Sequence, residues 1–409
     1  MKILHTSDWH IGRALYGRKR YAEFEAFLDW LANTIEDENI DVLLVAGDVF
    51  DNSTPSNLAQ KLYYRFLCRV ASSADCQVVV IAGNHDSPSF LNAPRDLLAA
   101  MNVHVVGVAS ETPEDEVVVI PGPDKQPGLI VCAIPYLRDR EIRKAEAGES
   151  VEDKEQKIVD GIRSHYQKVC AAAEAVRERL ERPVPMVAMG HLFAAGGRTV
   201  DGDGVRRLYI GSLGQVRADV FPEAIDYLAL GHLHIPQRVG GSERVRYSGS
   251  PLPIGFGEAE QEKSVVLVEF SNEPPTVITK PVPIFQALKI LKGDWQSLSG
   301  CLEKMKAEGS RAWVEVVYDG EDIVGNLREQ LDEAVVDTEI EILRIAHNRL
   351  LERSLGENAV AASLDDIDPD EVFERCLQAY EVPAEQVNAL QHAYQEIIVA
   401  LDEDDPRAQ

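Results

Sequence analysis

Short apolar runs recur along the N-terminal part of the chain, and polar side chains follow each run directly. The clearest run is residues 42–46, five small or apolar residues without alternation, which is typical of a strand buried on both faces of a sheet. The run ends at Gly47, and Asp48 is the next residue. Because α/β sheets bind ligands at the carboxyl ends of their strands, the pattern predicts that Asp48 lies at a binding site.

Polar residues follow four more apolar runs in the same way, at residues 1–6, 78–82, 187–189 and 227–230. In four of the five cases a glycine separates the strand from the polar group, which lets the backbone turn sharply and leaves space beside it. The metal-binding side chains at these strand ends are Asp8, His10, Asp48, Asn84, His191, His232 and His234. A single histidine is usually a satisfied core or surface residue, but five strand ends of this kind indicate one shared site.

The residue types of this set favour a pair of divalent ions. Carboxylate, amide and imidazole ligands without a thiolate suit Mn²⁺ better than a structural zinc ion. Two ions roughly 3.5–4 Å apart can hold the attacking and the leaving oxygen of a phosphoryl displacement and lower the pKa of a water between them. Asp8 and Asp48 leave the two ions with an excess of positive charge, which suits an anionic phosphodiester.

Helix and strand patterns continue to about residue 280. Amphipathic spacing predicts helices at residues 23–33, 55–71 and 89–101, and a charged helical stretch at residues 138–182. Two apolar runs within residues 117–134 flank a turn rich in proline and glycine, which predicts a hairpin. Strands resume at Tyr247 and at residues 265–270. We therefore predict an α/β fold, a β-sandwich flanked by helices, for residues 1–280.

Two further parts follow a boundary marked by four prolines between Pro274 and Pro283. Residues 284–346 alternate β-α-β-α-β and predict a small α+β domain without a catalytic pattern. After a polar linker at residues 347–366, residues 367–409 predict a helix pair with apolar stripes that two short helices cannot bury alone. The pair docks either on the rest of this chain or on a partner helix, and the linker favours a partner.

Composition adds three expectations. The chain has 409 residues, more than one typical core, and no apolar run long enough to span a membrane. Its six cysteines form no C-x-x-C pair, and without a secretory leader we expect reduced thiols and a cytoplasmic protein. The net charge of −27 argues against broad nucleic-acid binding by this chain alone.

One basic loop stands out in this acidic chain. Residues 11–22 contain no acid and carry Arg13, Arg18, Lys19 and Arg20, directly after the first candidate ligands. A solvated loop is the plain interpretation. Contact with a phosphate backbone is the interpretation that the position of the loop favours.

These motifs resemble those of the calcineurin-like metallophosphoesterases. The matching segments are Asp8-x-His10, Gly47-Asp48-x-x-Asp51, Gly83-Asn84-His85-Asp86, Gly190-His191 and Gly231-His232-x-His234. The whole chain, from the run at residues 3–10 to the C-terminal helices, resembles the family of nuclease subunits that act with a bacterial SbcC-type ATPase. No residue of the family motif is missing.

The resemblance implies a role for each motif residue. One Mn²⁺ would be bound by Asp8, His10, Asp48 and His234, and the other by Asp48, Asn84, His191 and His232. Asp48 would bridge the two ions, with Mg²⁺ or another divalent ion as the alternative metal. His85 would protonate or stabilise the leaving group, Asp86 would orient His85, and Asp51 would support the ligands from behind.

The resemblance also implies a substrate and partners. The family cleaves double-stranded DNA ends from 3′ to 5′ and opens hairpins endonucleolytically, in DNA repair and recombination. ATP would be used only by the SMC-like partner, which would bind residues 367–403, while residues 284–346 would form a domain that caps the DNA. A homodimer within the complex and a place on the nucleoid are further expectations.

Two other classes of function stay open at this point. A small-molecule phosphodiesterase or phosphatase would share the metal site but would have no use for the two C-terminal parts. A regulatory protein with a decayed site would have lost ligands, and none is lost here.

Overall fold

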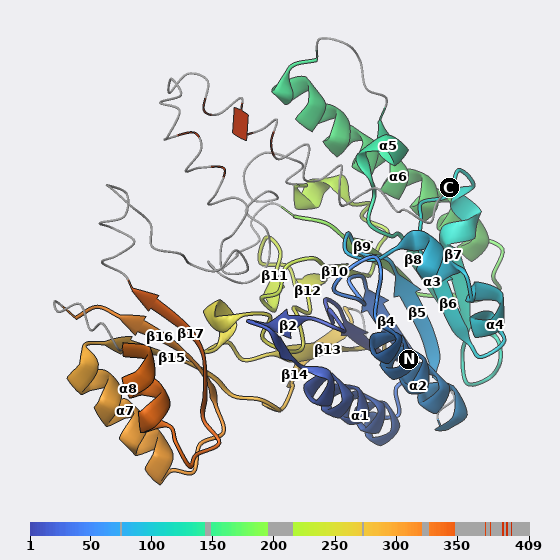
Figure 1. Cartoon of the computed structure of the whole chain (residues 1–409). Coiled ribbons are helices and arrows are strands. Elements are labelled where there is room, and N and C mark those ends of the chain that lie inside the picture. Colours follow the sequence, from blue (N-terminus) through green and yellow to red (C-terminus); the bar gives the residue numbers. More distant parts are fainter. Residues whose placement is uncertain are drawn as a thin grey trace. The chain divides into compact units, whose positions relative to one another are not determined.

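The computed structural model divides into two compact units (Figure 1). It describes residues 1–73, 76–143, 149–194, 216–271, 274–320 and 327–347, and the single residues 373, 377, 387, 390, 391 and 394. Of the described residues, the larger unit contains Met1–Arg13 and Lys19–Phe285, and the smaller one contains Ala14–Arg18 and those from Gln286 onward. The predicted linker and C-terminal helix pair lie outside the described residues, except for the single positions named above.

Two six-stranded sheets form the centre of the larger unit. The first has the strand order β14-β13-β1-β4-β5-β6. Its strands are β1 (Lys2–Thr6), β4 (Val42–Ala46), β5 (Gln77–Ile81), β6 (Val103–Val106), β13 (Ser264–Glu269) and β14 (Thr276–Pro281). β1, β4, β5 and β6 are parallel, and β13 and β14 add an antiparallel edge. The carboxyl ends of β1, β4 and β5 therefore lie at the same edge of this sheet.

The second sheet has the strand order β11-β12-β10-β9-β8-β7. Its strands are β7 (Val117–Pro121), β8 (Pro127–Ala133), β9 (Met186–His191), β10 (Tyr227–Gly231), β11 (Gln237–Arg238) and β12 (Val245–Tyr247). β8, β9, β10 and β12 are parallel to one another. β7 and β8 are antiparallel, so the hairpin predicted within residues 117–134 is present.

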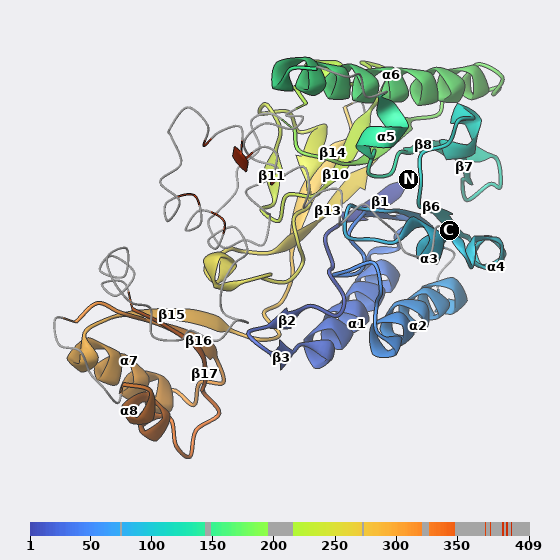
Figure 2. The same ribbon diagram turned by 45° about the horizontal axis from the view of Figure 1, so that its top comes forward.

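Helices cover the outer face of each sheet, while the inner faces pack on each other. α1 (Tyr21–Glu38) and α2 (Asn57–Ser73) lie on the first sheet and α6 (Val151–Arg177) on the second, as Figure 2 shows. Leu43 and Val45 of β4 pack among the residues of α1 and α2, whereas Leu44 and Ala46 pack between the sheets. Both faces of β4 are buried, which explains its run of apolar residues without alternation. The predicted α/β sandwich flanked by helices is confirmed.

Two predicted helices are shorter than their sequence patterns. The pattern at residues 89–101 forms α3 (Pro88–Asn92) and α4 (Arg95–Ala99), because Pro94 between them has no N–H for a continuous helix. The stretch at residues 138–182 forms α5 (Asp139–Ile142) and α6, and α6 starts where the Ser150 hydroxyl accepts the N–H of Asp153. The described part of the unit also contains the 3₁₀ turns η1 (Pro113–Glu116), η3 (Ala218–Val220) and η4 (Phe256–Glu258).

In its described residues the smaller unit contains a three-stranded parallel sheet and two helices. Its elements are β15 (Leu288–Gly293), α7 (Trp295–Ala307), β16 (Trp313–Tyr318), α8 (Leu327–Ala334) and β17 (Glu341–His347), in the predicted order. β2 (Ala14–Leu15) and β3 (Arg18–Lys19) pair as a hairpin. Within the smaller unit, the guanidinium of Arg344 lies over the ring of Tyr16, 5.3 Å from its centroid, and Arg18 forms an ion pair with Glu341. The contiguous domain ranges predicted from sequence did not assign residues 14–18 to the smaller unit.

None of the helices in the described ranges is long and apolar enough to cross a membrane.

Candidate metal centre

The seven predicted ligands come together where the two sheets present the carboxyl ends of their central strands. β1, β4 and β5 of the first sheet meet β9 and β10 of the second at this end. The predicted set is Asp8, His10, Asp48, Asn84, His191, His232 and His234. All of them except the half-buried Asn84 are at most 5% exposed. The site is therefore a buried cluster of polar side chains, which needs a compensating partner.

Three residues form the first half of the cluster. The Nε2 atoms of His10 and His234 lie 3.2 Å apart, and a carboxylate oxygen of Asp8 is within 4.8 Å of the ligand atoms of both. Two imidazole nitrogens that point at each other beside a carboxylate form a donor set that suits a divalent cation.

Asp48 connects this half to the other. Its Oδ2 atom lies 3.6 Å from Nε2 of His10 and 3.3 Å from Nε2 of His191. The side-chain oxygen of Asn84 lies 3.0 Å from Nε2 of His191 and 3.1 Å from Nδ1 of His232. One carboxylate oxygen therefore lies between the two groups of ligands, in the position that a bridging ligand needs. No thiol takes part, so the set fits two divalent ions with oxygen and nitrogen ligands.

The backbone is distorted at several candidate ligands. Positive φ angles, which non-glycine residues rarely adopt, occur at four of them, namely Asp8 (53°), His10 (48°), Asp48 (50°) and His232 (102°). Nearby glycines leave space for the side chains of the site. A Cβ atom on Gly47 would lie 2.3 Å from Nδ1 of His191, and one on Gly83 would lie 2.0 Å from Oδ1 of Asp48. Such strain persists where the surrounding structure enforces it, typically at functional sites.

Charge is concentrated around Asp48. Burial favours the neutral form of this carboxyl, but His191, His85 and His10 outweigh burial and hold the pKa of Asp48 well below its usual range. Burial likewise lowers the pKa of His191, but Asp48 and Asp8 more than offset it and raise that pKa to about 9. Without a metal, an anionic Asp48 is thus paired with a protonated His191. A divalent cation would replace that proton, since ligating histidines must be neutral.

His85 lies beside the cluster without joining the two ligand groups around Asp48. Its Nδ1 atom is 2.9 Å from the carbonyl oxygen of Asp51, and its backbone N–H donates to Oδ1 of Asp48 at 2.9 Å. Its ring packs edge-on against that of His10, with centroids 4.9 Å apart. The Asp51 carboxylate lies 3.5 Å from Nδ1 of His10 and accepts a hydrogen bond from Arg13 at 3.1 Å. Asp51 thus supports one ligand and one candidate catalytic residue.

Asp86 hydrogen-bonds to backbone groups, whereas the resemblance implies that it orients His85. Its carboxylate accepts the backbone N–H groups of Val49, Phe50 and Gly83 at 2.9–3.1 Å. Burial, together with the charge of Asp48, raises the pKa of Asp86 to about 6, although these N–H groups oppose the rise. Asp86 therefore ties together the loops after β4 and β5, while the ring of His85 is oriented by the Asp51 carbonyl.

The four basic residues of the predicted phosphate-binding loop have different surroundings. Arg20 is 2% exposed; its guanidinium donates two hydrogen bonds to Glu23, at 2.8 and 2.9 Å, and one to the carbonyl of Pro253. It is a buried structural residue with no guanidinium edge left for a phosphate. Arg13 is half-buried next to Asp51, whereas Arg18 and Lys19 are exposed.

Two residues of the centre were missed by sequence reasoning. Glu258 is 0% exposed and accepts from Nδ1 of His234 at 3.2 Å, and it forms a buried ion pair with Lys263. Lys263 and His234 hold the pKa of Glu258 at about 2, although burial acts in the opposite direction. A glutamate 24 positions beyond a ligand has no spacing signature, so no sequence signal points to this contact.

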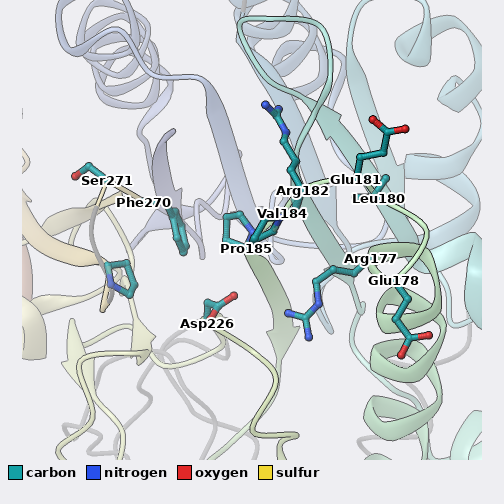
Figure 3. A pocket seen from close by; sticks show the side chains of 12 residues that line it. Arg177, Glu178, Leu180, Glu181, Arg182, Val184, Pro185, Asp226, Phe270 and Ser271 are labelled. Atoms are coloured by element: carbon teal, nitrogen blue, oxygen red, sulfur yellow. The ribbon is translucent and has the colours of Figure 1, made fainter.

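A separate pocket of about 690 Å³ lies at the other ends of the same strands (Figure 3). Pro185 and Asp226, which precede β9 and β10, line it together with Arg177, Arg182 and Phe270. Two of its polar side chains are engaged within the protein. Arg182 pairs with Asp124, and Asp226 accepts the N–H of Met186 at 2.8 Å. The convergent ligands lie at the opposite strand ends, so we place the functional site there.

Comparison with protein families agrees with this geometry. A family model described as calcineurin-like phosphoesterase matches residues 1–236, which is more than half of the chain. The protein is thus a metal-dependent phosphoesterase of the calcineurin-like class. A second model, described as type 5 capsule protein repressor C-terminal domain, matches residues 284–381.

Relatives define the family within this class. The Escherichia coli K12 protein named as the SbcD subunit of the nuclease SbcCD is 37% identical over 96% of this chain and 97% of its own. Proteins of the same name from Rhodobacter capsulatus and Bacillus subtilis are 39% and 36% identical, over 69% and 66% of this chain and 70% and 66% of their own. The chain belongs to the SbcD family of nuclease subunits. A solved dimetal phosphatase from Danio rerio covers 69% of this chain and 95% of its own at 12% identity, with a TM-score of 0.39, too low to carry an argument.

Proposed function

We propose that this chain is a Mn²⁺-dependent DNA nuclease subunit that acts with an SbcC-type ATPase in DNA repair and recombination. It degrades double-stranded ends from 3′ to 5′ and opens hairpins. The observation that carries the proposal is the 96% coverage by a relative named as the SbcD subunit of a nuclease, in a chain whose seven candidate ligands converge at one end of the sandwich. Mg²⁺ or another divalent ion is the alternative metal.

The ligands divide between two ions that share Asp48. One Mn²⁺ would be held by Asp8, His10, Asp48 and His234, and the other by Asp48, Asn84, His191 and His232. The position of Asp48 Oδ2, 3.6 Å from one group and 3.3 Å from the other, supports this division. When bound, such a pair of ions supplies an activated water and neutralises charge on the phosphate.

His85 is the residue that serves the leaving oxygen. Its Nδ1–H donates to the carbonyl of Asp51, which fixes the ring and leaves Nε2 to give a proton to the departing alkoxide. In this step a water oxygen forms a new P–O bond and gives up a proton to solvent. The P–O bond to the leaving group breaks, and the leaving oxygen takes the Nε2 proton of a protonated His85. Asp86 acts at a distance, because it holds the backbone of the loops that carry Asp48 and Asn84.

DNA contact falls to cations of the basic loop and to partners. Arg13, Arg18 and Lys19 are the members of the basic loop that we propose for phosphate contact, and Arg20 is excluded by its burial. Three cations in a chain of net charge −27 give only a weak electrostatic attraction for DNA. Residues 284–346 would cap the DNA. A homodimer within the complex would bring two such surfaces together. The complex would act in the cytoplasm, on the nucleoid.

The ATPase would bind residues 367–403. Among the few described residues of this segment, the rings of Phe373 and Tyr394 stack with centroids 4.0 Å apart and planes 5° apart. This contact brings positions 373 and 394 together, as packing of the two predicted helices on each other would require. The outer apolar stripe would then be available to a partner helix.

One experiment tests the proposal. The purified chain with Mn²⁺ is assayed on hairpin-ended duplex DNA and on an aryl phosphodiester, with and without the SbcC-type ATPase and ATP. A chain ending at Ala346 is the matched variant. The full chain should cleave both substrates and gain DNA cleavage with the ATPase and ATP. The shortened chain should keep only the aryl ester activity and fail to co-purify with the ATPase. Hydrolysis of the aryl ester alone, with the ATPase present, would favour a small-molecule phosphodiesterase.

A further inference from the structure

A buried ion pair lies directly behind one of the candidate metal ligands. Glu258 and Lys263 are 0% and 5% exposed and form a salt bridge in the interior of the larger unit. Removing two charges from water is costly, and a hydrophobic pair of similar volume is often no less stable. The family motif described above does not account for this pair, so its surroundings must explain it.

The hydrogen bonds of Glu258 are divided between its two oxygens. Oε2 accepts from Lys263 Nζ, from the Ser250 hydroxyl at 3.3 Å and from the backbone N–H of Ile254 at 3.0 Å. Oε1 lies 3.2 Å from Nδ1 of His234. Because three donors hold one oxygen in place, the other is directed at the imidazole.

Lys263 fixes the same histidine from its backbone side. Its Nζ donates to the carbonyl oxygen of His234 at 3.1 Å and to the Ser250 hydroxyl at 3.0 Å. The backbone N–H of Ser250 donates to that same carbonyl at 3.1 Å. The pair therefore restrains both the ring and the main chain of His234.

We propose that Glu258, held by Lys263, is a positioning residue that fixes His234 for metal binding. Glu258 accepts the Nδ1–H, so the lone pair of the neutral ring is on Nε2, the atom that faces His10 at 3.2 Å. A carboxylate behind a ligating histidine also makes the imidazole a stronger donor. The inference rests on the metal centre of the proposed function but not on its substrate or its partner.

The two halves of the centre differ in this respect. Both histidines of the Asp8 group have a carboxylate behind Nδ1, namely Glu258 at 3.2 Å from His234 and Asp51 at 3.5 Å from His10. In the other half, Nδ1 of His191 faces the neutral carbonyl of Ala46 at 2.9 Å. Loss of Glu258 should therefore weaken one ion site and leave the other.

The test is Mn²⁺ binding to the metal-free full-length chain, measured by calorimetry and by electron paramagnetic resonance. In Glu258→Gln, one of the two ions should bind roughly 10- to 100-fold more weakly, the usual effect of losing such a partner, and the other should be unchanged. Glu116→Gln is the matched control, because Glu116 is also 0% exposed and contacts a histidine, His165, that is no ligand. Long-range ¹H–¹⁵N spectra should show His234 as the Nδ1–H tautomer in the parent and a changed signal in Glu258→Gln.

Each outcome has a distinct meaning. Parental affinity for both ions in Glu258→Gln, or an equal loss in Glu116→Gln, would overturn the positioning role. If the parent chain binds no Mn²⁺, the metal centre of the proposed function fails and this inference fails with it. Should Glu258→Gln not fold, the double variant Glu258→Leu with Lys263→Met removes the pair without stranding a charge. It must show the same loss at one ion site, and parental binding there would refute the proposal.

Discussion

The Nε2 atoms of His10 and His234 face each other at 3.2 Å inside the protein. Both residues are at most 3% exposed, and their rings meet at 74°. Two neutral imidazoles gain from this approach only when a proton or a cation lies between the nitrogens. The contact is therefore the kind of geometry that a bound metal ion would stabilise.

Metal should accordingly stabilise the fold, and Asp48→Asn should abolish the effect. Mn²⁺ at a hundred times its dissociation constant should raise the free energy of unfolding by about 2.7 kcal/mol for each site, and chelation should remove the gain. Because Asp48 lies between both ligand groups, its loss should weaken both ions. Elemental analysis and thermal unfolding measure the two effects. Two ions retained at full occupancy in Asp48→Asn would contradict the bridging position.

Replacing His85 should separate metal binding from catalysis. In His85→Gln both ions should remain, since the proposed ligands are untouched, while turnover of DNA falls by roughly 10²–10⁴, the scale for losing a general acid. The loss should shrink on an aryl ester with a good leaving group, which needs little protonation. His104→Gln, a change at a histidine away from the site, is the control. Equal losses on good and poor leaving groups would instead assign His85 to phosphate positioning.

Replacing Arg20 should affect stability, whereas replacing Lys19 should affect DNA binding, although the two residues are adjacent in the basic loop. Arg20→Met strands the buried carboxylate of Glu23 and should lower the free energy of unfolding by about 3–5 kcal/mol, and adding Glu23→Leu should recover most of this loss. Lys19→Gln should leave stability within ~0.5 kcal/mol. It should reduce the salt dependence of DNA binding by about one counterion. Chemical denaturation and a salt titration of binding decide between a structural and a phosphate-binding role at each position.

His5 should make the metal-free fold sensitive to acid. It lies between the sheets, bonded to the Tyr227 hydroxyl at 3.0 Å and the Leu230 carbonyl at 3.2 Å, and burial lowers its pKa from 6.5 to about 3. Between these values the unfolded chain binds a proton that the folded chain does not, so stability falls as the pH drops below about 6.5, by ~1.4 kcal/mol per pH unit. From pH 7.5 to 5, His5→Gln should therefore lose about 2 kcal/mol less than the parent. Parallel stability profiles of parent and variant would show that His5 does not titrate as described.

The pattern of strands and glycines was enough to predict most of the fold of the larger unit and the set of candidate ligands. Parallel strands end at one edge of their sheet, so polar residues placed just after β1, β4, β5, β9 and β10 had to converge. The glycine before a ligand was equally informative, because a side chain at Gly83 would overlap Asp48. These relationships are local in sequence and repeat, which makes them visible without a structure.

Contacts between distant, unrepeated positions were not visible. Arg20 looked like a free cation because nothing in its loop shows that Pro253, far along the chain, covers it. The pairing of Glu258 with His234 likewise depends on where the η4 turn places Glu258 against the loop after β10. Side-chain partners of this kind follow from tertiary packing, and a single sequence does not show which distant residues come into contact.

The hairpin at residues 14–18 has a consequence for how such proteins can be recombined. These five residues belong to the smaller unit, where Tyr16 meets Arg344 and Arg18 meets Glu341, although the residues on either side of them belong to the larger one. A gene fusion that joined the first 285 residues of this chain to the remainder of a relative would set residues 14–18 of one protein against the smaller unit of another. A chimera that exchanged residues 14–18 together with the smaller unit would keep both from one protein. The segments of the two units alternate along the chain, so a single crossover point does not separate them.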